Sequence, residues 1–261
     1  MGRKVPDVKP FLLLGIRNED AAADDEYDAF VRFTGLPENL LHRVRLERRP
    51  LGPVDLDDYA GIFLGGGPFN ASDPDRLKSP VQRRVELELH ALLDRVVERD
   101  FPFLGACYGI GVIGTHQGGT VDGTYAEPIG RVPVSLTSAG MADPLLADLP
   151  STFEAFVGHK EAVTELPAHA VRLATSPGCP VQAFRIGRNV YATQFHPELD
   201  IQGLCTRIDV YKHSGYFAPE EAESVKAAAR LGRVFEPPKI LQRFVDRYAS
   251  MTRAPRGGAL A

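Results

Sequence analysis

The stretch Phe101–Gly109, which reads FPFLGACYG, decides the expected fold. It opens with an apolar run of strand length, continues as Gly-x-Cys-x-Gly and leads into a segment compatible with a helix. This pattern is typical of a nucleophile elbow, where a tight strand-to-helix turn presents a reactive side chain and flanking glycines allow close backbone packing. We expect Cys107 on this turn, with the amides and positive dipole end of the following helix favouring its thiolate. A buried core cysteine is the alternative interpretation.

The motif QFHPE at 194–198 favours the reactive interpretation of Cys107. A catalytic thiol needs a base, and the base needs an acceptor that orients it. His196 and Glu198 supply these two groups, and Pro197 stiffens the backbone between them. The same pair could instead belong to a metal site, but no further ligands stand at a useful spacing, so we expect no metal and no cofactor.

The segments before the elbow alternate between strand and helix patterns. Apolar strands are expected at 11–16, 42–46 and 60–64, and helices at 24–33 and 79–99. The second helix opens with a capping box that has Pro at its first helical position. This alternation predicts an α/β fold with a mostly parallel, doubly wound sheet, whose active site lies at the carboxyl ends of the strands.

Short strands follow from about residue 129 and predict a small antiparallel addition that returns the chain to the site at His196. These strands are expected at 132–134, 152–159, 171–175, 181–186 and 190–195, with a hairpin turn at 187–189. Three helical patterns occupy 199–250. The expected organisation is therefore a flexible arm at 1–9, one domain at 10–200, a helical extension packed on it at 201–252 and a disordered tail at 253–261.

Composition excludes several classes of protein. The 261 residues are 44% hydrophobic, as in a globular protein with a sizeable core, and the net charge of −4 gives no basic footprint for nucleic acid. The three cysteines are scattered and form no disulfide framework. No stretch approaches the roughly 20 apolar residues of a membrane span. We expect a cytoplasmic protein with no nucleic-acid or membrane partner, and its oligomeric state stays open.

Several motifs in one order resemble the class I (triad) glutamine amidotransferase family, with the closest likeness to the glutaminase domain of GMP synthase. These motifs are the elbow at 105–109, Gly118-Gly119, QFHPE at 194–198, the glycine-rich LGGGP at 64–68 and FVGHK at 156–160. The resemblance covers roughly residues 10–200 and implies a flavodoxin-like class I glutaminase fold.

The resemblance also implies a reaction, the hydrolysis of the side-chain amide of glutamine. The Cys107 thiolate would attack the amide carbon and form a γ-glutamyl thioester. His196 would protonate the departing ammonia and then activate water, while Glu198 would orient His196 and stabilise its imidazolium.

Further residues take their roles from the same resemblance. The backbone N–H groups of Gly66 and Tyr108 would stabilise the oxyanion, in a loop that includes Gly67. His159 would lie near the glutamine pocket. The family usually carries Gln four residues after the nucleophile, where this chain has Gly111. This departure removes a substrate contact, opens space and leaves open whether free glutamine is the true substrate.

The fate of the ammonia separates three hypotheses. The chain carries neither a P-loop nor the Ser-Gly-Gly-x-Asp-Ser pyrophosphatase motif, so a partner synthetase would have to receive the ammonia. Alternatively, the chain is a stand-alone γ-glutamyl hydrolase or peptidase. A catalytically silent binding or regulatory subunit on the same fold is the third hypothesis, and the intact Cys-His-Glu set argues against it.

Overall fold

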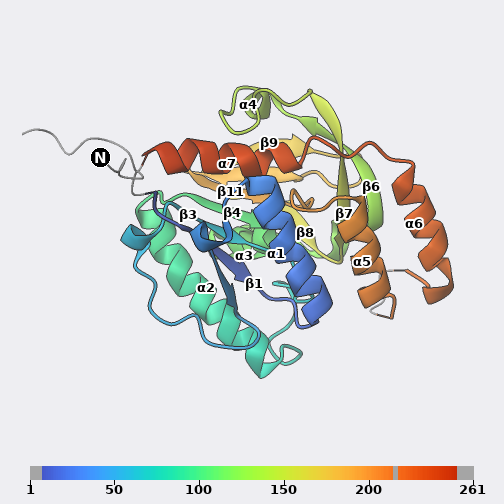
Figure 1. The fold of residues 1–261 in the computed structure, drawn as a ribbon, viewed down its shortest axis with the longest axis horizontal. Coiled ribbons are helices and arrows are strands. Elements are labelled where there is room, and N and C mark those ends of the chain that lie inside the picture. Colours follow the sequence, from blue (N-terminus) through green and yellow to red (C-terminus); the bar gives the residue numbers. More distant parts are fainter. Residues whose placement is uncertain (1–7, 214–216, 252–261) are drawn as a thin grey trace, which may run out of the picture.

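The computed structural model describes residues 8–213 and 217–251. Most of the expected N-terminal arm and the whole expected tail at 253–261 lie outside the described residues. Within them, strands form one large sheet with helices on both of its faces, and the chain returns at its C-terminal end to cover the face where it began (Figure 1).

The large sheet has two halves that meet beside the elbow strand. The parallel half runs in the order β2 (Leu41–Arg45), β1 (Phe11–Gly15), β3 (Gly61–Leu64), β4 (Phe103–Ala106) and β11 (Val190–Thr193). The antiparallel half continues as β10 (Ala183–Ile186), β9 (Val171–Thr175), β6 (Glu127–Leu136) and β7 (Thr152–His159). The predicted α/β class with a parallel sheet and an antiparallel addition is therefore confirmed.

Alternation along β1 shows why helices cover both faces. Phe11 and Leu13 join the core beneath α1 (Asp20–Thr34) and α7 (Pro238–Met251). Leu12 and Leu14 join the opposite core, beneath α2 (Pro80–Glu98) and α3 (Tyr108–His116). Because successive strand side chains point to opposite faces, a strand that is apolar throughout needs a helical layer on each side.

Some element boundaries differ from the expected ones. The helix predicted at 24–33 begins earlier, at Asp20, and ends at Gly35 in the left-handed conformation. The predicted start of α2 is confirmed, since Ser79 Oγ accepts from the Gln82 amide at 3.0 Å. No sequence pattern predicted the small sheet of β5 (Thr120–Asp122) and β8 (Ala162–Glu165) or the short α4 (Ser138–Met141). Short 3-10 turns occupy 38–40, 56–58, 123–125 and 219–221.

The three predicted C-terminal helices are present, as α5 (Ile201–Tyr211), α6 (Ala222–Arg230) and α7. Helix α5 packs on α1 and α6, and α7 packs on α1. Phe244 of α7 is fully buried, with its ring 5.1 Å from Phe63 and 6.2 Å from Phe11 between centroids. Helix α7 therefore completes the main core.

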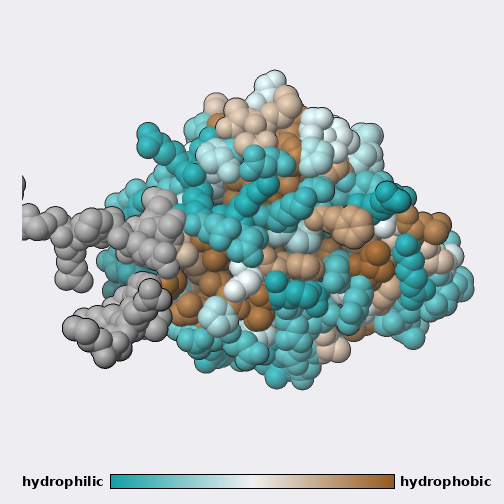
Figure 2. All heavy atoms as spheres, turned by 45° about the horizontal axis from the view of Figure 1, so that its top comes forward, coloured by the Kyte–Doolittle hydropathy of each residue, from teal (hydrophilic) through white to brown (hydrophobic). Residues whose placement is uncertain are grey.

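The surface of the molecule is mixed in character. Figure 2 shows one face, on which hydrophilic residues predominate and hydrophobic residues appear in patches between them. Among the described residues, no helix is both long and apolar enough to cross a membrane.

Candidate active site

Cys107 lies where the sequence predicted it, on the turn between β4 and α3. Its backbone has φ 52° and ψ −96°, a conformation that non-glycine residues rarely adopt and that costs free energy unless the surroundings impose it. Its amide donates to Thr193 O of β11 at 2.8 Å, which ties the turn to the neighbouring strand. The thiol thus projects at the carboxyl edge of the parallel strands.

His196 and Glu198 follow β11, the strand beside the elbow strand. The imidazole Nδ1 of His196 lies 2.8 Å from Glu198 Oε1, and both side chains are buried. The His196 amide donates to Phe156 O of β7 at 3.1 Å, which fixes the loop to the antiparallel half of the sheet. The ring and Cys107 line the same cavity, and Glu198 joins them through its contact with the ring.

Arg207 of α5 also contacts this pair, and no motif in the sequence predicted it. Its Nη2 donates to Glu198 Oε1 at 2.8 Å, and its Nη1 lies 3.0 Å from His196 Nδ1. Arg207 is 4% exposed. A signal for it exists in the sequence, because Arg207 falls on the apolar stripe of α5 with Leu204, Ile208 and Tyr211. A charged residue on such a stripe indicates a buried partner.

A second buried ion pair adjoins the first. Arg17, which follows β1, donates from Nε to Glu26 Oε1 of α1 at 2.8 Å, and Glu26 Oε1 is 3.5 Å from Arg207 Nη2. Arg17 Nη1 also donates to the hydroxyl of Tyr211 at 3.4 Å. Two guanidinium groups and two carboxylates therefore form one buried network that ends at His196.

Burial and this network decide the protonation states. Burial raises the pKa of the Cys107 thiol to about 12, and Arg17 and Arg207 oppose that effect only in part. The thiolate expected from the helix dipole is therefore not the resting form. Burial also lowers the pKa of His196 to about 4. Burial alone would raise the pKa of Glu198, but His196 and Arg207 outweigh it and hold that pKa well below its usual range. The resting site is thus a thiol, a neutral imidazole and a carboxylate.

The glycine-rich loop after β3 lies directly against these groups. A Cβ on Gly66 would lie 2.7 Å from His196 Cε1 and 3.1 Å from Arg17 Nη2, so only glycine fits there. Among the described residues, no protein acceptor takes the amides of Gly66 or Gly67. Tyr108 is the first residue of α3, where an amide has no partner within its own helix. Free amide donors therefore stand on two sides of Cys107.

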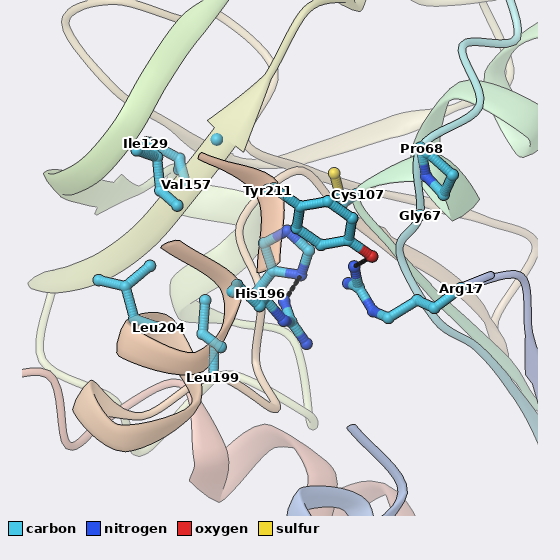
Figure 3. Close-up of a pocket in the computed structure, with 12 residues that line it drawn as sticks. Arg17, Gly67, Pro68, Cys107, Ile129, Val157, His196, Leu199, Leu204 and Tyr211 are labelled. Carbon is cyan, nitrogen blue, oxygen red and sulfur yellow. Dashed lines mark hydrogen bonds between the residues drawn. The ribbon is translucent and has the colours of Figure 1, made fainter. Parts of the chain in front are cut away.

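Two cavities share Cys107 in their linings. We call the first the polar pocket, with an empty volume of ≈ 250 Å³ and a lining that includes Asn70, Tyr108, His159, Lys160, Glu161 and Gln194. We call the second the apolar chamber, of ≈ 470 Å³ including its open mouth, lined by Arg17, Ile129, Val157, Leu199, Leu204, Arg207 and Tyr211, with His196. Figure 3 shows the chamber with its aliphatic side chains on one side and Arg17 on the other.

His159 lines the polar pocket but is held within the protein. Its Nε2 lies 3.0 Å from Glu127 Oε2, and its Nδ1 lies 2.9 Å from the carbonyl oxygen of Glu161. Because both ring nitrogens already have partners, His159 shapes the wall of the pocket. The expectation that His159 lies near a substrate pocket stays a prediction.

Gly111 does not open space, contrary to the expectation from the sequence. A Cβ there would lie 2.8 Å from Glu161 Oε1, so the glycine leaves room for that carboxylate. The two oxygens of Glu161 accept from the amides of Ala71 and Ser72 at 2.7 and 2.8 Å. Glu161, which no sequence motif identified, therefore fills the space that the sequence predicted beside Gly111.

Much of the chain is similar to known proteins. The family described as "Glutamine amidotransferase class-I" matches residues 41–203. A GMP synthase (glutamine-hydrolysing) of Petrotoga mobilis is 27% identical over 168 residues, which are 58% of this chain and 29% of that protein. One of Ectopseudomonas mendocina is 30% identical over 162 residues, which are 57% of this chain and 28% of that protein. The chain thus matches less than a third of the length of these relatives.

Solved structures share the fold. A glutamine amidotransferase from Thermotoga maritima superposes with a TM-score of 0.69 at 20% identity, covering 92% of this chain and 98% of that one. A glutamine amidotransferase from Methylobacillus flagellatus gives 0.65 at 21% identity, covering 97% and 98%. Since the family match spans more than half of the chain and includes the elbow and the His-Pro-Glu motif, the chain belongs to the class-I glutamine amidotransferase family.

Proposed function

We propose that this enzyme hydrolyses a γ-glutamyl amide with Cys107 as nucleophile, His196 as base and acid, and Glu198 as the residue that orients His196. The observation that carries the proposal is the buried His196–Glu198 hydrogen bond of 2.8 Å on the cavity into which the Cys107 elbow projects. A strained nucleophile turn beside an oriented imidazole is the arrangement that nucleophilic catalysis requires.

The polar pocket suits the amino-acid end of a glutamyl substrate. Its lining offers Lys160 for the α-carboxylate and Glu161 for the α-ammonium group. Gln194 is 1% exposed and its Oε1 has no hydrogen-bond partner among the described residues, although it lines this pocket. A buried polar atom without a partner is costly, and a bound polar ligand would satisfy it.

The chemistry follows from the resting protonation states. On attack, the Cys107 proton moves to His196, whose developing positive charge Glu198 stabilises. The amides of Gly66 and Tyr108 would stabilise the oxyanion of the tetrahedral intermediate. His196 then gives its proton to the leaving nitrogen, a γ-glutamyl thioester remains on Cys107, and water releases glutamate.

The acceptor of the ammonia is a separate part of the proposal. With glutamine as substrate, the free ammonia would pass to a partner synthetase, as the likeness to GMP synthases suggests. The second candidate is a stand-alone γ-glutamyl hydrolase, which the apolar chamber favours because ammonia alone does not need it. Purified chain supplied with ATP, XMP and ammonia should make no GMP in either case, and GMP formation would contradict both.

The decisive experiment measures glutamate release and covalent labelling together. Purified protein should release glutamate from glutamine or from a γ-glutamyl dipeptide, and a glutamine-like electrophile should add its mass to the peptide that contains Cys107. The Cys107→Ala variant should lose both. Cys179→Ala and Cys205→Ala are matched controls, because these two thiols are also free but lie away from both cavities.

Two results would contradict the proposal. Turnover that survives Cys107→Ala would exclude this residue as nucleophile. A wild-type protein that folds, yet neither labels at Cys107 nor releases glutamate from any γ-glutamyl amide, would leave the non-catalytic hypothesis as the better one.

A further inference from the structure

We propose that the apolar chamber binds the leaving amine of a substituted γ-glutamyl amide, and that this amine is an α-amino acid with an aliphatic side chain. The inference rests on the proposed function, which it deepens by naming the substrate class. The preferred substrates would be γ-glutamyl dipeptides such as γ-glutamyl-leucine.

The position of His196 identifies the chamber as the leaving-group side. Cys107 lines both cavities, whereas His196 lines the chamber and not the polar pocket. The residue that protonates the departing nitrogen must face that nitrogen. If the glutamyl part occupies the polar pocket, the scissile bond lies at Cys107 and the amine extends past His196 into the chamber.

The wall of the chamber is apolar, which ammonia as a leaving group does not require. The aliphatic wall comes from three elements: Ile129 of β6, Val157 of β7 and Leu204 of α5. An apolar wall of this kind gains stability from an apolar substituent and gives ammonia nothing to contact.

The chamber favours an anionic ligand through unused guanidinium donors, although Glu26 and Glu198 already pair with the two groups. Two guanidinium groups, Arg17 and Arg207, line it, and none of its described lining residues is Asp or Glu. Arg17 Nη2 has no acceptor among the described residues, and neither has the buried Nε of Arg207. A carboxylate on the ligand would satisfy these donors, whereas a diamine or polyamine would bring a second positive charge to them.

The arrangement of these groups matches the three substituents of an α-carbon. Arg17 lies across the chamber from the aliphatic side chains, with Cys107 and the His196 ring between them in the view of Figure 3. The nitrogen of the ligand would thus face His196, its carboxylate would face Arg17, and its side chain would lie against Leu204 and its neighbours.

The reaction balances with water as the only co-substrate. A bond forms between Cys107 Sγ and the carbonyl carbon of the γ-amide, the bond from that carbon to the amide nitrogen breaks, and the thiol proton travels through His196 to the nitrogen. The amino acid leaves. Water then adds to the thioester, its proton returns by way of His196 to the sulfur, and glutamate departs.

The test is a matched series of substrates with the wild-type protein. Glutamine supplies no substituent, γ-glutamyl-glycine a carboxylate without a side chain, γ-glutamyl-isopentylamide the side chain without a carboxylate, and γ-glutamyl-leucine both. We expect kcat/KM for γ-glutamyl-leucine to exceed that of each of the others by at least roughly 10- to 200-fold, the range for filling an apolar pocket.

Two variants test whether the preference for a carboxylate comes from Arg17 and the preference for a side chain from the aliphatic wall. Arg17→Met should remove most of the preference for γ-glutamyl-leucine over the isopentylamide, and Leu204→Phe should remove most of its preference over γ-glutamyl-glycine. Gln202→Ala, on the exposed side of α5, is the control and should change neither ratio. Ratios within one variant do not depend on how much of the protein is folded.

The outcomes separate the two proposals. Cys107-dependent hydrolysis of glutamine without any preference for γ-glutamyl-leucine would overturn this inference and leave the proposed function standing. A preference for the isopentylamide would overturn the role of Arg17. If no substrate of the series shows Cys107-dependent turnover, the proposed function itself fails.

Discussion

Arg207 donates to the same oxygen of Glu198 that accepts the hydrogen bond of His196, at 2.8 Å in both cases. The guanidinium therefore holds Glu198 ionised in a site with almost no solvent, and its positive charge beside the ring disfavours protonation of His196. A residue of the C-terminal helices thus sets the charge state of the proposed triad.

Arg207→Met tests this role directly. Without the guanidinium, Glu198 loses a charged donor, a contact of about 1.5–3 kcal/mol, and we expect kcat for the preferred substrate to fall roughly 10- to 100-fold. Arg207→Lys should recover only part of this loss, because an ammonium group cannot contact both partners in the fork geometry. Steady-state kinetics with labelling of Cys107 checks the result.

Arg32→Met is the matched control for that experiment. Arg32 also joins α5 to the rest of the chain, through a 2.8 Å ion pair with Asp200, but its side chain is half exposed. Its loss should change kcat less than twofold, since exposed pairs contribute little. Equal losses in the two variants would mean that Arg207 matters only for attachment of the helix.

The pH dependence follows from the lowered pKa of His196. Between about pH 6.5 and 4, His196 binds a proton in the unfolded chain but not in the folded chain. The free energy of unfolding therefore falls as the pH falls through this range. Activity should persist to lower pH than an ordinary histidine allows, with the acid limb of kcat/KM near pH 4. Measurement of kcat/KM from pH 4 to 9, with circular dichroism to monitor folding, would show this. An acid limb near 6.5 would contradict it.

Gly111→Gln should impair the enzyme. The added side chain starts 2.8 Å from Glu161 Oε1 and must displace the carboxylate that two loop amides hold. We expect KM for any γ-glutamyl substrate to rise about tenfold, the effect of roughly one lost polar contact. Thr115→Ala, on an adjacent turn of α3, is the control. Improved use of glutamine by Gly111→Gln would show that Glu161 can move aside.

The contribution of α7 to the core gives a stability prediction. Phe244 is fully buried against Phe63 and Tyr248, so Phe244→Ala should lower the free energy of unfolding by about 3–5 kcal/mol. Lys239→Ala on the exposed side of the same helix should change it by less than about 0.5 kcal/mol. Urea unfolding measures both. A small effect of Phe244→Ala would mean that α7 is only loosely attached.

The sequence predicted correctly those structural features that a few consecutive residues specify. Strand periodicity and the Ser79 cap placed the parallel half of the sheet and α2, and the elbow and the His-Pro-Glu motif indicated residues that the fold brings together. These features are local because a turn or a cap is specified by a few consecutive residues. The edge strands β5 and β8 were missed because each has only three or four residues and little periodicity.

The sequence was least informative where distant residues meet in the interior. Arg207 and Arg17 carry no motif, and their role depends on α5 packing on α1. Glu161 lies 50 residues after Gly111 in the chain, so nothing local indicates that its carboxylate fills the space beside that glycine. The lowered pKa of His196 and the raised pKa of Cys107 are likewise consequences of burial, which only the folded chain defines.

The place of Arg207 in the chain has a consequence for biosynthesis. A nascent polypeptide that has emerged only as far as Glu198 already carries Cys107, His196 and the glycine-rich loop at 64–68, but it lacks the guanidinium of Arg207 and the helices that close the core. Such a chain lacks α5, so the buried network around Glu198 cannot yet form. We therefore expect the proposed site to be completed only after synthesis of the chain has passed all three proposed catalytic residues.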